Sequence, residues 1–234
     1  MANRQATLSN KDKFTHDYSI LSGAAIGVTF VRTREPFRAA DALRELTFSN
    51  SDERDYRFWT FTHGWSTYNR QDMNADPTVD NNNKPLPALY AVNGVDQAEG
   101  FPENGLYVMM WPHFLMKADA PLPAFIQCLA EYAQAFPEVS KRLVMLVPME
   151  FTMPPELEDC VALLDFDVPN EGELAEALDQ TLGNLTDDNR PDFDREDIAQ
   201  ITRAGVGMTW AEFEGALSRA LVIHRSSLPN VDVE

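Results

Sequence analysis

Hydrophobic residues along the chain follow two kinds of pattern. Short runs rich in β-branched and aromatic residues predict strands. Between them, apolar residues at three- and four-residue spacing predict helices. The predicted strands are residues 25–33, 55–63, 105–110, 141–148 and 160–169, and the predicted helices are residues 36–46, 87–97, 122–136, 170–178 and 209–224. Nearly continuous apolar strands that alternate with helices are typical of a parallel sheet covered on both faces.

The pattern changes near both ends of the chain. Residues 1–24 are polar and predict an N-terminal segment outside the core, and residues 25–182 predict an α/β domain with a five-stranded, mainly parallel sheet. Residues 183–234 predict a small helical module and tail, whose first part is an acidic linker. Asn170 with Glu173, and Thr209 with Glu212, have the spacing of helix capping boxes. Residues 64–87 form a long stretch rich in Asn, Asp and Pro, which predicts a functional or mobile loop.

Composition narrows the classes of function. The chain has 234 residues, of which 44% are hydrophobic, enough for a packed core. Its 37 acidic and 19 basic residues give a formal charge of −18, which repels phosphate backbones and disfavours nucleic-acid binding. The sequence contains neither a secretory signal nor an apolar run long enough for a membrane. Cys128 and Cys160 fit free thiols better than a disulfide framework. We expect a soluble, cytoplasmic protein.

A sheet followed by a helical module resembles the architecture of AAA+ ATPases, in which each phosphate-handling position can be checked. The first strand should lead into a glycine-rich loop with a lysine, but "RTREPFR" (residues 32–38) follows it. The third strand should end in carboxylates, but Trp111 and Pro112 stand there. Pro148 takes the place of a polar residue after the fourth strand, and residues 149–160 contain no arginine. The sequence therefore predicts no ATP hydrolysis by this chain and neither a nucleotide nor a metal cofactor.

One stretch resembles a specific family. The run "LVMLVPMEFTMPPELEDCVALLDFDVPNEGELAEAL" (residues 143–178) is similar to the N-terminal half of AAA+ ATPases first noticed as a conserved plastid open reading frame (Ycf-type), which also occur in cyanobacteria and other bacteria. The matching positions are Pro148, Pro154, Pro155, Glu156, Leu157, Asp165, Phe166 and Pro169, with His113, Phe114 and Leu115 earlier and Gly207, Thr209, Glu212 and Ala220 later. The resemblance covers roughly residues 25–225 and is patchy before residue 85.

In that family the N-terminal half is a degenerate AAA-like domain that precedes a catalytic domain. The resemblance implies a catalytically inactive regulatory or assembly domain of P-loop type that binds protein, either its own subunits or a companion ATPase domain. It also implies that an ATP-binding domain would follow near residue 234 of a longer protein. A stand-alone paralogue without that motor is the alternative.

Two groups of aromatic residues are candidates for protein contacts. Trp65, Tyr68 and Arg70 combine aromatic and basic character in the manner of interface hot spots, although part of this cluster could belong to the core. Trp111, His113 and Phe114 follow the third strand. We expect Trp111 and Phe114 to fill, as an apolar plug, the crevice that holds phosphate and magnesium in an active relative. His113 is expected to be a packed or capping residue rather than a ligand or an acid/base, because it is a single histidine beside Trp and Phe.

A different class of function rests on Asp165 and Asp167. These residues flank Phe166 near the end of the fifth strand, so both carboxylates are expected on one face of the carboxyl edge. Paired carboxylates bind Mg²⁺ or Mn²⁺. The alternative function is therefore a small Mg/Mn-dependent hydrolase that uses Asp165 and Asp167. The other interpretation is that both residues only cap and solvate this edge of the sheet.

Overall fold

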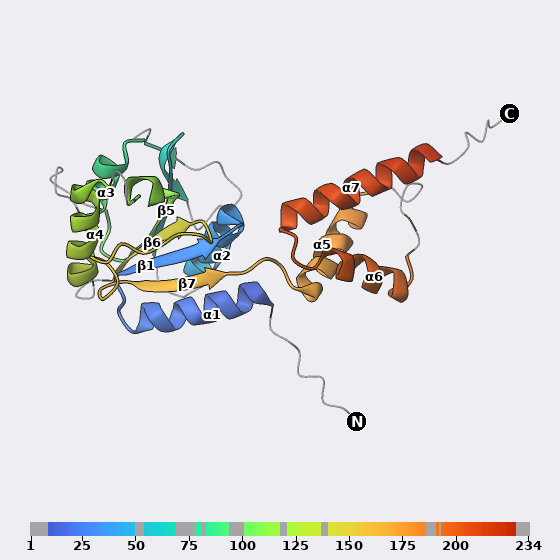
Figure 1. Ribbon diagram of the computed structural model, residues 1–234, viewed down its shortest axis with the longest axis horizontal. Helices are drawn as coiled ribbons and strands as arrows, with labels where there is room; N and C mark the ends of the chain where they lie inside the picture. The colour runs from blue at the N-terminus through green and yellow to red at the C-terminus, as the bar shows by residue number, and fades with distance from the viewer. Residues whose placement is uncertain are drawn as a thin grey trace, which may run out of the picture. The chain divides into compact units, whose positions relative to one another are not determined.

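A computed structural model gives the architecture (Figure 1) and describes residues 9–49, 54–68, 78–80, 83–93, 101–117, 121–136, 140–185, 191 and 193–227. The chain divides into two compact units. The first is Lys13–Phe166, which contains the sheet. The second combines the described residues of Met1–Asp12 with those of Asp167–Glu234.

The sheet has seven strands in the order β4-β3-β2-β5-β6-β1-β7. They are β1 (Val28–Thr33), β2 (Asp55–Thr60), β3 (Gly64–Tyr68), β4 (Thr78–Val79), β5 (Gly105–Met110), β6 (Lys141–Val147) and β7 (Ala162–Phe166). Strands β2, β5, β6, β1 and β7 are parallel, which confirms the predicted α/β class and its five core strands. The antiparallel strands β3 and β4 lie where a loop was predicted, because Gly64, with φ of 72°, turns the chain back beside β2.

Helices cover both faces of the sheet (Figure 1). Their bounds are α1 (Asn10–Gly23), α2 (Pro36–Ser49), α3 (Pro85–Asn93) and α4 (Pro123–Ala135). Tyr107 and Met109 of β5 belong to the core cluster beneath α3 and α4. Val108 and Met110 belong to the cluster formed with α1 and α2. Alternate side chains of one central strand thus fill two separate cores, which is why its sequence is apolar throughout.

Helix α1 was not expected, because residues 1–24 are polar and were predicted to lie outside the core. Its sheet-facing side depends on Phe14 and Tyr18, which are both buried. They are four residues apart and therefore lie on one face of the helix. The ring of Phe14 lies 4.9 Å from that of Phe166 in an edge-to-face contact. Two aromatic anchors are enough to attach a helix whose other positions are mostly polar.

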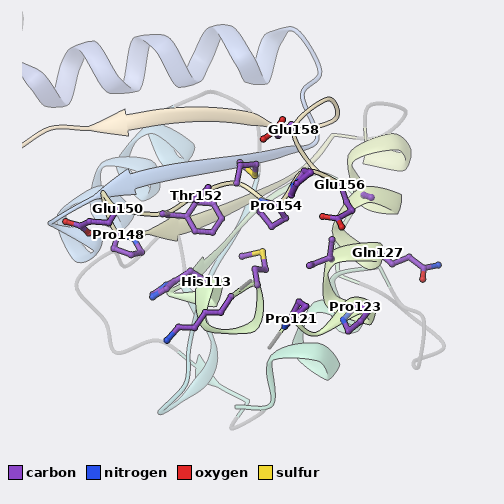
Figure 2. A pocket seen from close by; sticks show the side chains of 17 residues that line it. His113, Pro121, Pro123, Gln127, Pro148, Glu150, Thr152, Pro154, Glu156 and Glu158 are labelled. Carbon is purple, nitrogen blue, oxygen red and sulfur yellow. The ribbon is translucent and has the colours of Figure 1, made fainter. Parts of the chain in front are cut away.

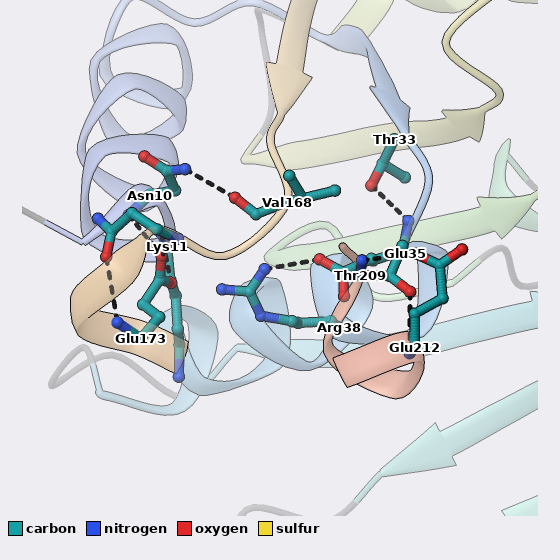
Figure 3. Close-up of polar contacts among 10 residues, drawn as sticks. Asn10, Lys11, Thr33, Glu35, Arg38, Val168, Glu173, Thr209 and Glu212 are labelled. Atoms are coloured by element: carbon teal, nitrogen blue, oxygen red, sulfur yellow. Dashed lines mark hydrogen bonds and ion pairs between the residues drawn. The ribbon is translucent and has the colours of Figure 1, made fainter. Parts of the chain in front are cut away.

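The second unit is built from α5 (Glu171–Gly183), α6 (Arg195–Gly205) and α7 (Trp210–Ser227), which pack around one apolar cluster. Both predicted capping boxes form, at Asn170 with Glu173 and at Thr209 with Glu212 (Figure 3). The buried carboxylate of Glu173 also accepts backbone N–H groups from residues 10 and 11, at 3.0 and 3.2 Å. Helix α5 therefore belongs to the helical unit, and the boundary lies after Phe166 rather than at residue 182.

The end of β5 departs from the prediction. The backbone N–H of Trp111 still donates to Leu146 O at 2.9 Å, but its φ of 57° and ψ of 38° are left-handed. A short 3-10 helix, η1 (Pro112–Leu115), begins immediately afterwards. Trp111 is 39% exposed and Phe114 is 50% exposed. The expected apolar plug is therefore wrong, since the backbone turns away from the strand direction and leaves both rings accessible to solvent.

The left-handed backbone of Trp111 predicts that a glycine variant at this position is more stable than an alanine variant. A residue with a Cβ is disfavoured there by about 1–2 kcal/mol, whereas glycine is not. We expect Trp111→Gly to be more stable than Trp111→Ala by about 0.5–1 kcal/mol in urea denaturation. The exposed Gln127 on α4 provides the matched control, where Ala should exceed Gly by about 1 kcal/mol. The same order at both positions would contradict the left-handed assignment.

Close packing at the end of α6 generates a second prediction. A Cβ on Gly205 would lie 2.5 Å from a ring carbon of Phe213 and 3.3 Å from Leu174. Gly205→Ala should therefore destabilise the helical unit by about 1–3 kcal/mol, as overpacking does. Gly183→Ala, at the end of α5, meets no atom within 4 Å and should be neutral or stabilising. Thermal unfolding of both variants would test this, and equal melting temperatures would contradict it.

Candidate functional site

The turn from β1 into α2 contains a buried carboxylate (Figure 3). Glu35 is only 8% exposed, and Arg38 Nη1 donates to its Oε2 at 2.7 Å. The backbone N–H of Glu35 is bonded to Thr33 Oγ1 at 2.9 Å. Pro36 follows as the first residue of α2 and carries no N–H. The start of this helix is an anion-favouring position, and the chain places its own carboxylate there.

Glycine and lysine are absent from this turn, as noted from the sequence, but Glu35 was not among the predicted site residues. The available signal was the Glu-Pro pair, since proline at the first helical position makes the preceding residue the N-cap. Glutamate is also stabilised near a helix N-terminus by the macrodipole.

The residues after β5 form one side of a groove. His113 lies in η1, with its ring 4.1 Å from that of Phe114. Its Nδ1 is buried and has no hydrogen-bond partner among the residues that the structure describes. Partial burial, and then the charge of Lys117, lowers the pKa of His113 below its ordinary value. The imidazole is therefore neutral near pH 7, as expected for a packed residue and not for a fixed cation.

Exposed aromatic rings gather at the carboxyl ends of the strands. Phe61 follows β2 and lies 6.4 Å from the ring of Phe114, in an edge-to-face arrangement. The Nζ of Lys117 lies 5.0 Å from the centre of the Phe114 ring. Phe37, in the first turn of α2, is 60% exposed. We define the aromatic edge as the four residues Phe37, Phe61, Trp111 and Phe114.

Beside this edge lies a groove of about 1150 Å³, bordered by η1, α4 and residues 148–158 (Figure 2). Its apolar lining includes Met116, Ile126, Phe151 and Met153. The ring of Phe151 stacks on Phe30 of β1 at 5.3 Å, and this contact fixes the wall to the sheet. Leu157, fully buried, donates its N–H to Pro154 O at 3.0 Å. The proline-rich segment is therefore an ordered wall and not a loose loop.

The rim of the groove carries charge of both signs. Glu150, Glu156 and Glu158 come from the 148–158 wall, and Figure 2 shows their carboxylates distributed around the opening. His113 and Lys117 come from the side of η1. Because His113 is neutral, the rim has three carboxylates and one cationic side chain, that of Lys117. The groove thus combines an apolar floor with a predominantly acidic rim.

The partner of Asp165 in the structure is Arg32. Arg32 Nε and Nη2 donate to Asp165 Oδ1 and Oδ2 at 2.6 and 2.9 Å, so both carboxylate oxygens are engaged. Asp167 is exposed beyond the end of β7. Within the described part of the chain, no group of three His, Cys, Asp or Glu residues is arranged to hold a metal. The hydrolase hypothesis therefore gains no support from this pair.

The predicted hot spot of Trp65, Tyr68 and Arg70 does not form a surface. Trp65 is buried beneath α3, where its Nε1 donates to Ala88 O at 3.0 Å. Tyr68 is three residues further along β3 and so faces the other side of the sheet, where the guanidinium of Arg44 lies 5.0 Å from its ring. Arg70 lies outside the described residues.

Comparisons with known proteins agree with this architecture. Residues 14–166 match the family model of the SpoVK-like AAA ATPase N-terminal domain. A chain of the E. coli MS115-1 HORMA:CdnC:Trip13 complex is similar with a TM-score of 0.54 and 11% identity, over 94% of this chain and 80% of that chain. The FIGL-1 AAA domain in complex with ADP has a TM-score of 0.54 and 10% identity, over 94% and 72% of the two chains.

No match was found among curated proteins. Of the helices built from described residues, none has the length and apolar character required to span a bilayer. The two solved structures share only the fold with this chain, whereas the family model covers most of the sheet-bearing unit. By that match, the chain belongs to the family of SpoVK-like AAA ATPase N-terminal domains.

Proposed function

We propose that this chain is a non-hydrolysing AAA-like regulatory or assembly domain that binds protein through the carboxyl edge of its sheet. The observation that carries the proposal is the buried carboxylate of Glu35 at the start of α2. A nucleotide phosphate at this position would need free backbone N–H groups and a cation. It would instead meet a carboxylate of its own sign, a proline without an N–H, and an arginine already bonded to that carboxylate.

The residues after β5 support the same proposal. Magnesium-dependent hydrolysis requires carboxylates at the end of the central strand to hold the ion and orient water. That position is occupied by Trp111, Pro112 and His113. The imidazole of His113 is neutral near pH 7. None of these side chains is a hard oxygen ligand for Mg²⁺.

The aromatic edge and the neighbouring groove favour a protein as the ligand. The groove volume of about 1150 Å³ exceeds the range of roughly 300–1,000 Å³ that is usual for small-molecule pockets. Exposed aromatic residues beside an apolar groove are typical of interface hot spots. One fold relative is a chain of a HORMA:CdnC:Trip13 complex, which is itself an assembly of different proteins. The partners that the proposal names are a second copy of this chain or a companion AAA+ ATPase domain.

The first test is nucleotide binding. We expect isothermal titration calorimetry of the full chain with Mg·ATP or Mg·ADP to show no micromolar binding, because the phosphate position is filled by Glu35. Glu35→Gln removes the charge but leaves Pro36 and the missing lysine, so it should not create a site. Magnesium-dependent binding at micromolar concentration by the parent chain would end the proposal.

The second test concerns the aromatic edge. Phe114→Ser should weaken association by about 2 kcal/mol or more, as hot-spot truncation does, while its half-exposed ring contributes less than about 1 kcal/mol to folding. Sedimentation velocity measures self-association, and the same runs with an added SpoVK-like ATPase catalytic domain measure the other partner.

Val222→Ser is the matched control for Phe114→Ser. Val222 is 68% exposed on α7, in the other compact unit, and its truncation should not change association through the aromatic edge. Equal behaviour of the two variants would show that the aromatic edge is not the contact surface. A parent chain that binds neither partner would contradict the protein-binding role itself.

A further inference from the structure

The groove beside the aromatic edge carries three carboxylates on one wall. Glu150, Glu156 and Glu158 all belong to residues 148–158, and all three are exposed. Within the described part of the chain, none of these side chains takes part in a hydrogen bond or an ion pair. The side of the groove formed by η1 and α4 contributes one cationic side chain, that of Lys117. The acidic wall can therefore bind positively charged groups from outside the chain.

The sequence around the groove adds no positive charge to it. Residues 118–120, which connect Lys117 and Pro121 of the lining, are Ala-Asp-Ala, and no Lys, Arg or His adjoins any lining residue in the sequence. Arg70 follows Tyr68, which pairs with the start of β2 at the opposite end of the parallel strands. The other basic side chains outside the described part of the chain are those of Arg4, Arg190, His224 and Arg225.

The three carboxylates do not converge on one point. Among the described residues, no group of three His, Cys, Asp or Glu side chains is arranged to hold a metal ion. Figure 2 shows Glu150 beside Pro148, apart from Glu156 and Glu158. One small cation could therefore not contact all three carboxylates, whereas several separate cationic side chains could. A partner with more than one Lys or Arg matches this distribution of charge.

The backbone of this wall fixes where the carboxylates lie. Phe151 donates its N–H to Pro148 O at 3.0 Å and so closes the turn that carries Glu150. The N–H of Leu157 closes the turn that carries Glu156 in the same way. Two consecutive prolines, whose φ is fixed, restrict the second turn further. Because the wall is already ordered, a partner that binds to it loses little conformational entropy on this side of the contact.

The floor of the groove requires an apolar group in the ligand. Met116, Ile126 and Met153 line it. Methionine is flexible and adapts to apolar groups of different shape. An apolar side chain on this floor would remove apolar surface from water, whereas a purely charged ligand would leave that surface hydrated. The groove therefore favours a ligand that is both apolar and cationic.

We infer that the groove binds a segment of a partner protein in which apolar residues are interspersed with Lys or Arg. The inference rests on the proposed function, since it names the chemistry of the partner at the carboxyl edge. The apolar side chains contact the floor, and the basic side chains pair with the carboxylates of the 148–158 wall. The alternative is that these glutamates only solvate the surface of a chain with a formal charge of −18. Their positions in the groove would then have no effect on binding.

The test uses three labelled synthetic peptides. The first contains equal numbers of Leu and Lys, the second has Glu in place of every Lys, and the third has Ser in place of every Leu. Fluorescence anisotropy with the full chain at physiological salt should show saturable binding of the Leu/Lys peptide alone, because the other two lack either the charge or the apolar contact. Equal affinity for either of the other peptides, or no saturable binding of the Leu/Lys peptide, would overturn the inference.

Paired variants separate the groove from the overall charge of the chain. Glu156→Gln together with Glu158→Gln should weaken binding of the Leu/Lys peptide about threefold or more, the loss expected for two exposed ion pairs. Glu176→Gln together with Glu196→Gln removes the same charge from exposed positions on α5 and α6 and should bind like the parent. Added potassium chloride should weaken binding by the parent more steeply than binding by the groove variant. Equal losses in the two double variants would contradict the inference.

A further variant keeps the inference testable if the glutamate variants do not fold. Thr152 is exposed on the lining, and Thr152→Lys should weaken binding of the Leu/Lys peptide because the new ammonium group repels its lysines. Gln180→Lys adds the same charge on α5 and should have no effect. Unchanged binding by Thr152→Lys would count against the groove as the site.

The peptide results can be told apart from those of the proposed function. The sedimentation experiments measure association with whole proteins, so association that persists without peptide selectivity would overturn this inference alone. Peptide binding as expected, without association of the whole proteins, would contradict the partners named above and support the groove chemistry.

Discussion

The five parallel strands are covered on both faces, by α3 and α4 on one side and by α1 and α2 on the other. This burial determines where chemistry can occur. Charged groups are costly inside either core, so polar functional groups are confined to the two edges where the strands begin and end. Among the described residues, the groove and the aromatic edge lie at the carboxyl edge, and a pocket lined by Arg54 and Arg142 lies at the amino edge. The two edges differ in the side chains that line them.

The groove at the carboxyl edge has an apolar floor and a predominantly acidic rim, and Arg54 and Arg142 line a pocket at the amino edge. The difference follows from short-range structure rather than from net charge. Each arginine at the amino edge precedes or begins a strand and lies near the negative end of a helix. At the carboxyl edge the helix begins with its positive end, and Glu35 meets it.

The sequence predicted the parallel strands because a strand buried on both faces is apolar at successive positions, as in β5 and β6. It predicted the capping boxes because their signal is local. It did not predict α1, whose sheet-facing side rests on Phe14 and Tyr18, nor β3, which follows a glycine inside a region without helical or strand periodicity. Attachment of these elements depends on residues distant in sequence, such as Phe166 and Ala88.

The candidate sites were harder to predict than the fold. Trp65 and Tyr68 are neighbours in the sequence, but the period of two along a strand sends them to opposite faces. Trp111 was placed at the correct edge, but its exposure depends on a left-handed backbone that no composition rule reveals. The groove is formed by η1, α4 and residues 148–158. Only the tertiary structure brings these three segments together.

The buried carboxylate of Glu35 shows how the proposed function would differ from that of a nucleotide-dependent domain. In a nucleotide-dependent domain the anion at the start of this helix binds and leaves, so the local charge changes during each cycle. Here the anion is a side chain of the same chain, buried and bonded to Arg38, so it does not leave. Under the proposed function, the turn between β1 and α2 has no ligand-dependent switch but keeps the electrostatic stabilisation of the helix. A domain of this kind can offer a constant binding surface at the carboxyl edge, which suits an assembly role better than a motor.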